Sequence, residues 1–245
     1  MEIVPADRPG SFYVHVDGMP QSHVDLLDPT RLAIDYVRRL GDLVDAMPAG
    51  PLRVVHLGGA GLTLARYVHA TRPGSNQVVL EPHGELTALV RARLPLPRRA
   101  GIKVRPIDGR TGLDGVSTAD LVIVDAFAAA EVPRELLSAE ALGRMQELAT
   151  TVALNLVDRA PFALTRRVLA ALSDPTVVAD EAVLKGRRAG NLVVAAGATA
   201  PGVGSGVHGS TSRVLRGVAL RDRLGGGEPI TDAEIGWAQT PRTSP

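Results

Sequence analysis

Short apolar runs alternate with stretches of helical spacing along most of the chain. The runs have the length and the Val, Leu and Ile content of buried strands, and they cover 52–57, 77–81, 102–107, 120–125, 151–157, 176–179 and 191–196. Near-continuous apolar strands separated by helices are typical of a mostly parallel sheet covered on both faces. The pattern therefore predicts an α/β fold with a doubly wound, Rossmann-like sheet.

A different pattern precedes this sheet. Residues 12–24 alternate apolar and polar positions around an Asp-Gly pair at 17–18, which predicts a small β-hairpin appendage. An Asp-Pro pair at 28–29 is typical of a helix start, and apolar residues follow at helical spacing until Pro48. We therefore expect an N-terminal region of hairpin and lead-in helix over 1–48.

The remaining chain divides into two further predicted regions. A Rossmann-like nucleoside-binding domain is expected over 49–200. Gly and Ser dominate 201–212, which indicates a flexible linker, and a short helical stretch is expected at 213–224 before a Pro-rich end. Residues 201–245 are therefore interpreted as a linker and C-terminal tail.

Composition narrows the class of protein. The 245 residues suit one α/β domain with short additions, and 45% apolar with 22% charged residues is ordinary for a globular chain. A net charge of +1 argues against nucleic acid as a partner, and seven basic residues within 91–110 are interpreted as a solvated helix face and loop. No apolar run is long enough for a membrane span, and the chain has no cysteine. A cytoplasmic location is expected.

Ligands of open α/β sheets bind beyond the carboxyl ends of the strands, so the residues at those ends carry the functional hypothesis. The first predicted strand of the sheet ends in the small residues Gly58-Gly59-Ala60-Gly61, and a helical pattern follows. Such a turn lets backbone N–H groups and the positive helix terminus approach a ligand. We expect Gly58, Gly59 and Gly61 to contact an adenosine-bearing cofactor.

Each of the next three strands ends in an acid. Glu81 lies 23 residues after Gly58, near the spacing at which a carboxylate accepts hydrogen bonds from both ribose hydroxyls. Asp108 and Gly109 end the third strand, where the carboxylate could accept a hydrogen bond from an adenine amino group. Asp125 follows four apolar residues, where an acid is costly to bury without a partner or a function.

These acids discriminate between cofactor classes. The nicotinamide fingerprint needs glycine at its first, third and sixth positions, but counting from Gly58 the third is Ala60 and the sixth is Thr63. Carboxylates repel a pyrophosphate and suit a sulfonium nucleoside of the S-adenosylmethionine type. No metal is expected, since the six histidines show no metal-type pairing, and His56 is interpreted as packed on the sheet.

As a set, these motifs resemble the spermidine synthase family of polyamine aminopropyltransferases over roughly residues 12–197. The resemblance rests on Gln21 behind the hairpin turn, HLGGAGLTLARYV, the acid-ended strands and DLVIVDAF, and QSHVDLLDPTRLAIDYVRR is similar to actinobacterial spermidine synthase-like proteins. It implies a methyltransferase-type Rossmann domain, a homodimer, and decarboxylated S-adenosylmethionine as co-substrate. The implied reaction transfers an aminopropyl group to a small-molecule amine such as putrescine and leaves methylthioadenosine.

The resemblance also implies residue roles. Glu81 would hold the ribose and Asp108 the adenine amino group, while Gln21 would line the nucleoside or amine pocket. Asp125 would be the catalytic residue that orients the attacking amine and helps to take its proton.

The sequence departs from this family at the expected amine anchors. The family's turn usually reads Gly-Gly-Gly-Asp-Gly-Gly, and here the Asp is missing between Ala60 and Gly61. A second Asp usually follows the catalytic one by three residues, where this chain has Ala128. Only Tyr36 stands near the family's usual Tyr-His pair. Loss of two anchors would weaken amine binding by about 3–6 kcal/mol.

Two alternatives therefore stay open beside aminopropyl transfer. One is a methyltransferase that uses intact S-adenosylmethionine, because the missing acids are those that would repel a methionine carboxylate. The other is a non-catalytic member of the fold that binds the nucleoside or a protein partner.

Overall fold

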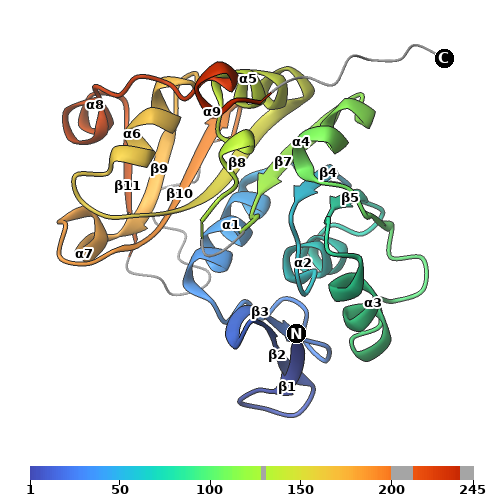
Figure 1. Ribbon diagram of the computed structural model, residues 1–245. Helices are drawn as coiled ribbons and strands as arrows, with labels where there is room; N and C mark the ends of the chain where they lie inside the picture. Colours follow the sequence, from blue (N-terminus) through green and yellow to red (C-terminus); the bar gives the residue numbers. More distant parts are fainter. Residues whose placement is uncertain (128–130, 200–211, 238–245) are drawn as a thin grey trace.

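The computed structural model describes residues 1–127, 131–199 and 212–237. The predicted linker, apart from its last residue, and Ala128 lie outside the described residues. The strands form two sheets (Figure 1). The small sheet contains β1 (Glu2–Pro5), β2 (Ser11–Val16) and β3 (Met19–Asp25). The large sheet contains β4 (Arg53–Leu57), β5 (Asn76–Leu80), β6 (Ile102–Arg105), β7 (Ala119–Val124), β8 (Ala149–Asp158), β9 (Thr176–Asp180), β10 (Gly190–Gly197) and β11 (Ser212–Arg216).

Most of the helices connect successive strands of the large sheet along the chain. They are α1 (Asp35–Ala46), α2 (Thr63–Thr71), α3 (Gly84–Arg93), α4 (Gly109–Gly112), α5 (Ala139–Leu148), α6 (Ala163–Ala170), α7 (Glu181–Leu184), α8 (Gly217–Leu224) and α9 (Asp232–Ile235). Two short 3-10 helices cover Leu113–Gly115 and Arg134–Leu136. All seven predicted strands of the sheet are present, which confirms the predicted fold class.

The large sheet has the strand order β11-β9-β10-β8-β7-β4-β5-β6. Strands β6, β5, β4, β7 and β8 pair in parallel, while β10 pairs antiparallel with both β8 and β9, and β11 pairs antiparallel with β9. The chain runs outward from β4 through β5 to β6 and then returns to β7 on the other side of β4. The strand order therefore reverses between β4 and β7, and a ligand site is expected at their carboxyl ends.

Alternate residues of the strands face two separate apolar cores. On β7, Val122 and Val124 pack into the core that includes α5, α6 and α8, whereas Leu121 and Ile123 pack into the core that includes α1 and α2. Burial of both faces explains the near-continuous apolar runs in the sequence. Helices cover the large sheet on both faces (Figure 1), and this packing holds the carboxyl ends of its strands in place.

The N-terminal appendage has one strand more than predicted. Residues 2–5 form β1, which pairs antiparallel with β2 so that Ile3 lies opposite Val14. The four-residue segment is too short for its alternation to be distinctive. Val14 and Val24 pack with residues of α2 and α3 in a third apolar cluster, and the small sheet lies next to α2 in Figure 1.

The first helix starts later than predicted. It begins at Asp35 and not at the Asp-Pro pair of 28–29. The carboxylate of Asp28 accepts hydrogen bonds from the backbone N–H and the hydroxyl of Thr30 (3.2 and 2.6 Å), which closes a local turn. Asp side chains often offer the backbone this alternative to a helix.

The predicted helix at 213–224 is wrong in its first half. Residues 212–216 form β11, an edge strand that pairs with β9, and only 217–224 form α8. Gly217, with φ +56°, separates the two elements. The SRVLR segment is a strand because β9 offers it a free edge, which local sequence does not show. The described part of the expected tail is thus joined to the main sheet.

Candidate functional site

Gly58 and Asp125 are adjacent at the point where the strand order reverses. The Gly58 N–H donates to the Leu80 carbonyl (2.9 Å), and the Asp125 N–H donates to the Leu57 carbonyl (3.0 Å). Gly58 has φ +81°, and a Cβ there would lie 2.6 Å from the carbonyl oxygen of Asp125. Only glycine fits this position, because it tolerates both the conformation and the close approach of the Asp125 backbone.

The other glycines of the turn serve packing. A Cβ on Gly59 would lie 2.8 Å from Cγ1 of Val79, and one on Gly61 would lie 2.8 Å from Cβ of Ser22. The Gly61 N–H donates to the Ser22 hydroxyl (3.1 Å), which attaches β3 to the turn. Ser22, next to the predicted Gln21, is therefore a hairpin residue that hydrogen-bonds to the turn.

Glu81 lies against the turn from the side of β5. Its side chain is buried, and one carboxylate oxygen accepts a hydrogen bond from the Ala60 N–H (3.4 Å). The other accepts from the His83 N–H and lies 3.0 Å from the His83 ring nitrogen Nδ1. The structure thus brings Glu81 and the Gly turn together.

Asp108 has a structural contact of its own. Its Oδ1 accepts a hydrogen bond from the Thr111 N–H (2.8 Å), so it caps the short helix α4. A Cβ on Gly109 would lie 2.7 Å from Cδ2 of Leu57, so this glycine allows α4 to approach β4. For Gln21, no side-chain hydrogen bond is found among the described residues.

The carboxylate of Asp125 accepts hydrogen bonds from two sides. The Asn155 amide donates to Oδ1 (3.0 Å), and the Tyr36 hydroxyl donates to the same carboxylate. The Asn155 oxygen in turn accepts from the Asn191 amide (3.0 Å). Burial of the carboxylate raises the pKa of Asp125 to about 6, and the bonds from Asn155 and Tyr36 act in the opposite direction. At neutral pH the group is therefore mostly ionised and able to accept a proton.

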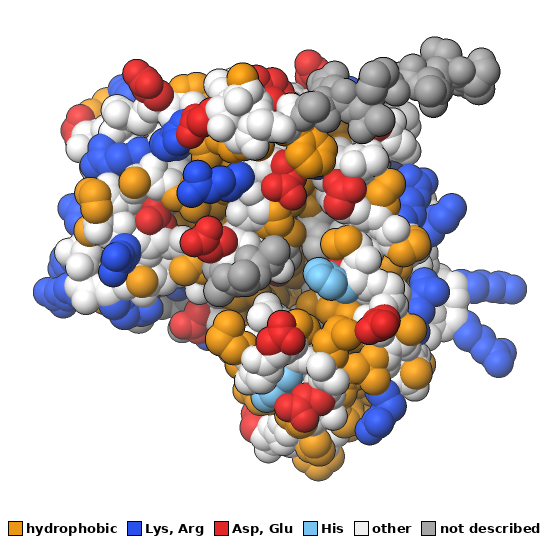
Figure 2. Space-filling model, viewed as in Figure 1, with side chains coloured by type: hydrophobic (Ala, Val, Ile, Leu, Met, Phe, Trp, Pro, Cys, Tyr) orange, Lys and Arg blue, Asp and Glu red, His pale blue; other side chains and the backbone are white. Residues whose placement is uncertain are grey.

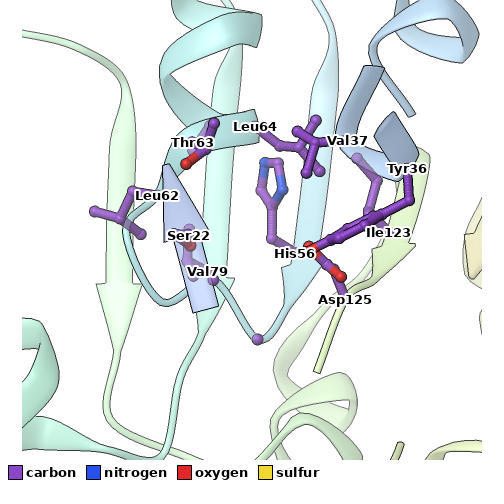
Figure 3. Close-up of a pocket in the computed structure, with 13 residues that line it drawn as sticks. Ser22, Tyr36, Val37, His56, Leu62, Thr63, Leu64, Val79, Ile123 and Asp125 are labelled. Carbon is purple, nitrogen blue, oxygen red and sulfur yellow. The ribbon is translucent and has the colours of Figure 1, made fainter. Parts of the chain in front are cut away.

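Tyr36 and His56 are tuned by the same surroundings. Burial, followed by the charge of Asp125, raises the pKa of Tyr36, so its hydroxyl stays protonated and donates. Burial lowers the pKa of His56 to about 4, so its imidazole is neutral near pH 7. Figure 3 shows the Tyr36 ring reaching the Asp125 carboxylate, with the His56 ring beside them.

A small cavity lies behind the Gly turn (Figure 3). Its volume is about 20 Å³, which suits a group of about the size of one water molecule. The lining residues come from both sheets and from α1 and α2: Ser22, Tyr36, Val37, His56, Gly58, Gly59, Leu62, Thr63, Leu64, Ala65, Val79, Ile123 and Asp125.

The cavity contains only one of the three predicted acids. Asp125 is on its wall, whereas the Glu81 carboxylate accepts from the Ala60 N–H and Asp108 caps α4. The three carboxylates therefore do not surround this cavity. The first turn of α2 also faces the cavity, and no side chain of the described residues caps this helix.

Sequence reasoning missed Asn155 and Ser22, and it interpreted His56 only as a packing residue. Asn155 and His56 are both fully enclosed polar residues within apolar strands. A polar residue inside such a run is the signal that could have identified them, since buried polar groups require partners.

The outer surface separates the charges. On the face seen in Figure 2, Lys and Arg side chains stand mostly at the two edges, and acidic side chains lie nearer the middle. Five of the basic residues within 91–110 are exposed: Arg91, Arg93, Arg98, Arg99 and Lys103. Among the described residues, no group of three His, Asp or Glu side chains could hold a metal ion. None of the described helices combines the length and apolarity needed to cross a bilayer.

Comparison with known proteins gives structural matches only. No family model matches the sequence, and no curated protein matches it. A probable spermidine synthase from Corynebacterium glutamicum superposes with a TM-score of 0.85 at 24% identity, covering 100% of this chain and 95% of that one.

Two further structures share the fold more distantly. A spermidine synthase in complex with the transition-state analogue AdoDATO has a TM-score of 0.55 at 14% identity, covering 78% of this chain and 67% of that one. Human methyltransferase-like protein 13 in complex with SAH has a TM-score of 0.51 at 17% identity, covering 85% and 92%. The resemblance inferred from the sequence is thus confirmed for the fold: the described part of this chain shares the fold of a probable spermidine synthase.

Proposed function

We propose that this protein transfers the aminopropyl group of decarboxylated S-adenosylmethionine to an amine, with Asp125 as the general base. The observation that carries the proposal is the position of Asp125. Its backbone lies against Gly58 at the point where the strand order reverses, its side chain lines the cavity behind the turn, and Tyr36 and Asn155 both donate to its carboxylate. The shared fold with a probable spermidine synthase supports the same reaction class.

The nucleoside would lie along the outer side of the Gly turn. Glu81, whose carboxylate lies at the Ala60 N–H, would accept hydrogen bonds from the ribose hydroxyls. Asp108 uses Oδ1 to cap α4, which leaves Oδ2 to accept a hydrogen bond from the adenine amino group. Gln21, on the adjacent β3, would border the same edge.

The chemistry at Asp125 is a proton transfer followed by a displacement. The incoming ammonium gives a proton to the Asp125 carboxylate and becomes a neutral amine. Its nitrogen lone pair then forms a bond to the propyl carbon next to the sulfonium, and the bond between that carbon and sulfur breaks. Methylthioadenosine leaves as a neutral thioether, the product nitrogen carries the positive charge, and Asp125 releases its proton to solvent.

Methyl transfer from intact S-adenosylmethionine is the second candidate. It is favoured by the first turn of α2, which faces the cavity without a side-chain cap. The positive end of a helix attracts a carboxylate, such as that of the methionine moiety.

The two reactions are separated by their products. Protein is incubated with an amine and either decarboxylated or intact S-adenosylmethionine, and the products are identified by mass spectrometry. We expect methylthioadenosine and an aminopropylated amine, with the rate lowered by roughly a hundredfold or more in Asp125→Asn. S-adenosylhomocysteine from the intact compound would instead establish methyl transfer. Absence of both products would contradict both reactions.

A further inference from the structure

Gln77 fixes the hydrogen atoms on the His56 ring. The Gln77 amide nitrogen donates to the Ala65 carbonyl (2.9 Å), which can only accept. The Gln77 oxygen is therefore the atom that faces Nε2 of His56 (2.9 Å), and Nε2 must carry the proton. Because the imidazole is neutral near pH 7, Nδ1 keeps a lone pair. Within the described residues, Nδ1 has no hydrogen-bond donor.

His56 and Asp125 thus present two acceptors to one small cavity. Both residues line it, from β4 and β7 respectively, and Figure 3 shows the ring and the carboxylate on the same side of the turn. The cavity volume of about 20 Å³ admits a head group of the size of an amine, while apolar residues such as Val37 and Leu64 line the remainder.

The charge on the cavity wall matches a single cation. Asp125 is the charged residue on this wall, because His56 is neutral and the other residues that line the described cavity do not ionise near pH 7. The positive end of α2 offsets part of the Asp125 charge. A second ammonium group would find no compensating carboxylate in this cavity, so it would stay outside the cavity in solvent and add nothing to binding.

We infer that this cavity is the subsite for one primary amino group of the acceptor, with His56 Nδ1 as its neutral hydrogen-bond acceptor beside Asp125. The acceptor class is accordingly a small alkyl monoamine, and a second amino group adds nothing to its recognition. This inference rests on the proposed function for the identity of the reaction. It makes His56 a specificity-determining residue, since it binds one N–H of the amine while Asp125 receives the proton.

Nuclear magnetic resonance of isotope-labelled histidine tests the subsite without any turnover. Free protein is expected to show His56 with Nε2 protonated and Nδ1 unprotonated. Titration with n-propylamine should shift the Nδ1 signal to saturation, and 1,4-diaminobutane should bind within roughly threefold of the same affinity. The inference is overturned if Nδ1 does not respond, if the diamine binds more than roughly tenfold more tightly, or if acetate shifts Nδ1 in place of the amine.

Two substitutions separate the two ring nitrogens. In His56→Gln the side-chain amide reaches the position of Nε2 and keeps the bond to Gln77, but the acceptor at Nδ1 is lost. In His56→Asn the amide oxygen occupies the position of Nδ1, and the bond to Gln77 is lost.

The two variants should therefore show opposite effects on amine affinity and on thermal stability. His56→Gln should weaken n-propylamine binding by roughly tenfold to a hundredfold with near-native melting temperature. His56→Asn should retain amine binding better and lose thermal stability. Equal amine affinity in His56→Gln and the unmodified protein would overturn the inference. Methylthioadenosine binding, measured in parallel, tests the proposed function. If the unmodified protein does not bind methylthioadenosine, aminopropyl transfer is contradicted. The response of His56 Nδ1 to the amine tests the subsite separately.

Discussion

The Asn155 side-chain amide donates to Oδ1 of Asp125 at 3.0 Å, from one parallel strand to the end of its neighbour. This bond stabilises the ionised carboxylate, so it holds the pKa of Asp125 below the value that burial alone would give. The Asn191 amide orients Asn155 by donating to its oxygen. The three residues connect β10 to the candidate catalytic edge of the sheet.

Asn155→Leu should therefore move the pH dependence of the reaction. Without the donor, the pKa of Asp125 rises above about 6, and the acid limb of the kcat profile shifts to higher pH. The measurement is methylthioadenosine release at saturating amine over a range of pH. Asn76→Leu, at an exposed position of β5, is the matched control and should leave the limb unchanged. A limb that stays fixed, or moves to lower pH, in Asn155→Leu would contradict the role given to this bond.

Asp125→Asn should stabilise the protein while it removes activity. A folded-state pKa of about 6 lies above the ordinary value of 3.8 for an aspartate, so the ionised form is disfavoured by folding. The protonated Asp125 carboxyl makes its full contribution to the free energy of unfolding below about pH 4. That contribution is lost as the pH rises through about 6. The difference corresponds to up to about 3 kcal/mol at neutral pH, less where solvent screens the charge.

Chemical unfolding of both proteins at two pH values checks this sign. The free energy of unfolding of Asp125→Asn should exceed that of the unmodified protein near neutral pH, and the gap should close near about pH 4. Comparison of the two proteins cancels the contribution of His56, which has the opposite pH dependence. If Asp125→Asn is less stable than the unmodified protein at neutral pH, folding favours the Asp125 carboxylate in its ionised form, and the predicted sign is wrong.

Gly58→Ala should be costly in both stability and nucleoside binding. The added Cβ would lie 2.6 Å from a backbone oxygen at a φ of +81°, so we expect a loss of roughly 2–4 kcal/mol. Gly143→Ala is the control, because a Cβ there meets nothing within 4 Å and alanine favours the helix by up to about 1 kcal/mol. Thermal unfolding should separate the two variants in opposite directions. A melting temperature of Gly58→Ala equal to the native one would rule out the tight approach of the turn to Asp125.

The ion pair between Arg110 and Asp232 should hold the C-terminal segment to α4. The two side chains are only 9% and 13% exposed, and their charged atoms lie 2.7 Å apart. Arg110→Met leaves Asp232 without its partner, at a cost of about 3 kcal/mol. Arg144→Met, which removes an exposed pair with Glu147, should cost less than about 0.5 kcal/mol. The free energies of unfolding decide this, and equal values for the two variants would show that α9 is attached by other contacts.

The sequence was sufficient for the sheet because its strands are buried on both faces. The run at 120–125 corresponds to β7 within one residue. Strands at the edges were harder: β1 and β11 depend on a neighbour that supplies an open edge, and local patterning does not reveal it. The start of α1 was lost to the competing turn at Asp28.

The sequence predicted which residues lie at the strand ends of the site. It did not predict which side chains hydrogen-bond to one another. Gly58 and Asp125 meet because both follow parallel strands, which the pattern already implied. The partners of His56 and Asn155 lie 21 and 30 residues away, on another strand or just after one, and a polar residue in an apolar run does not indicate its partner. Asp108 was assigned to a ligand from its position, although one of its oxygens caps α4.

Isothermal titration of methylthioadenosine measures nucleoside binding at the Gly turn, on which the proposed aminopropyl transfer depends. We predict binding at one site per chain, weakened roughly tenfold to a hundredfold in Glu81→Gln, because the substitution removes the carboxylate that would hold the ribose hydroxyls. Absence of binding by the unmodified protein to methylthioadenosine and to both forms of S-adenosylmethionine would contradict the account.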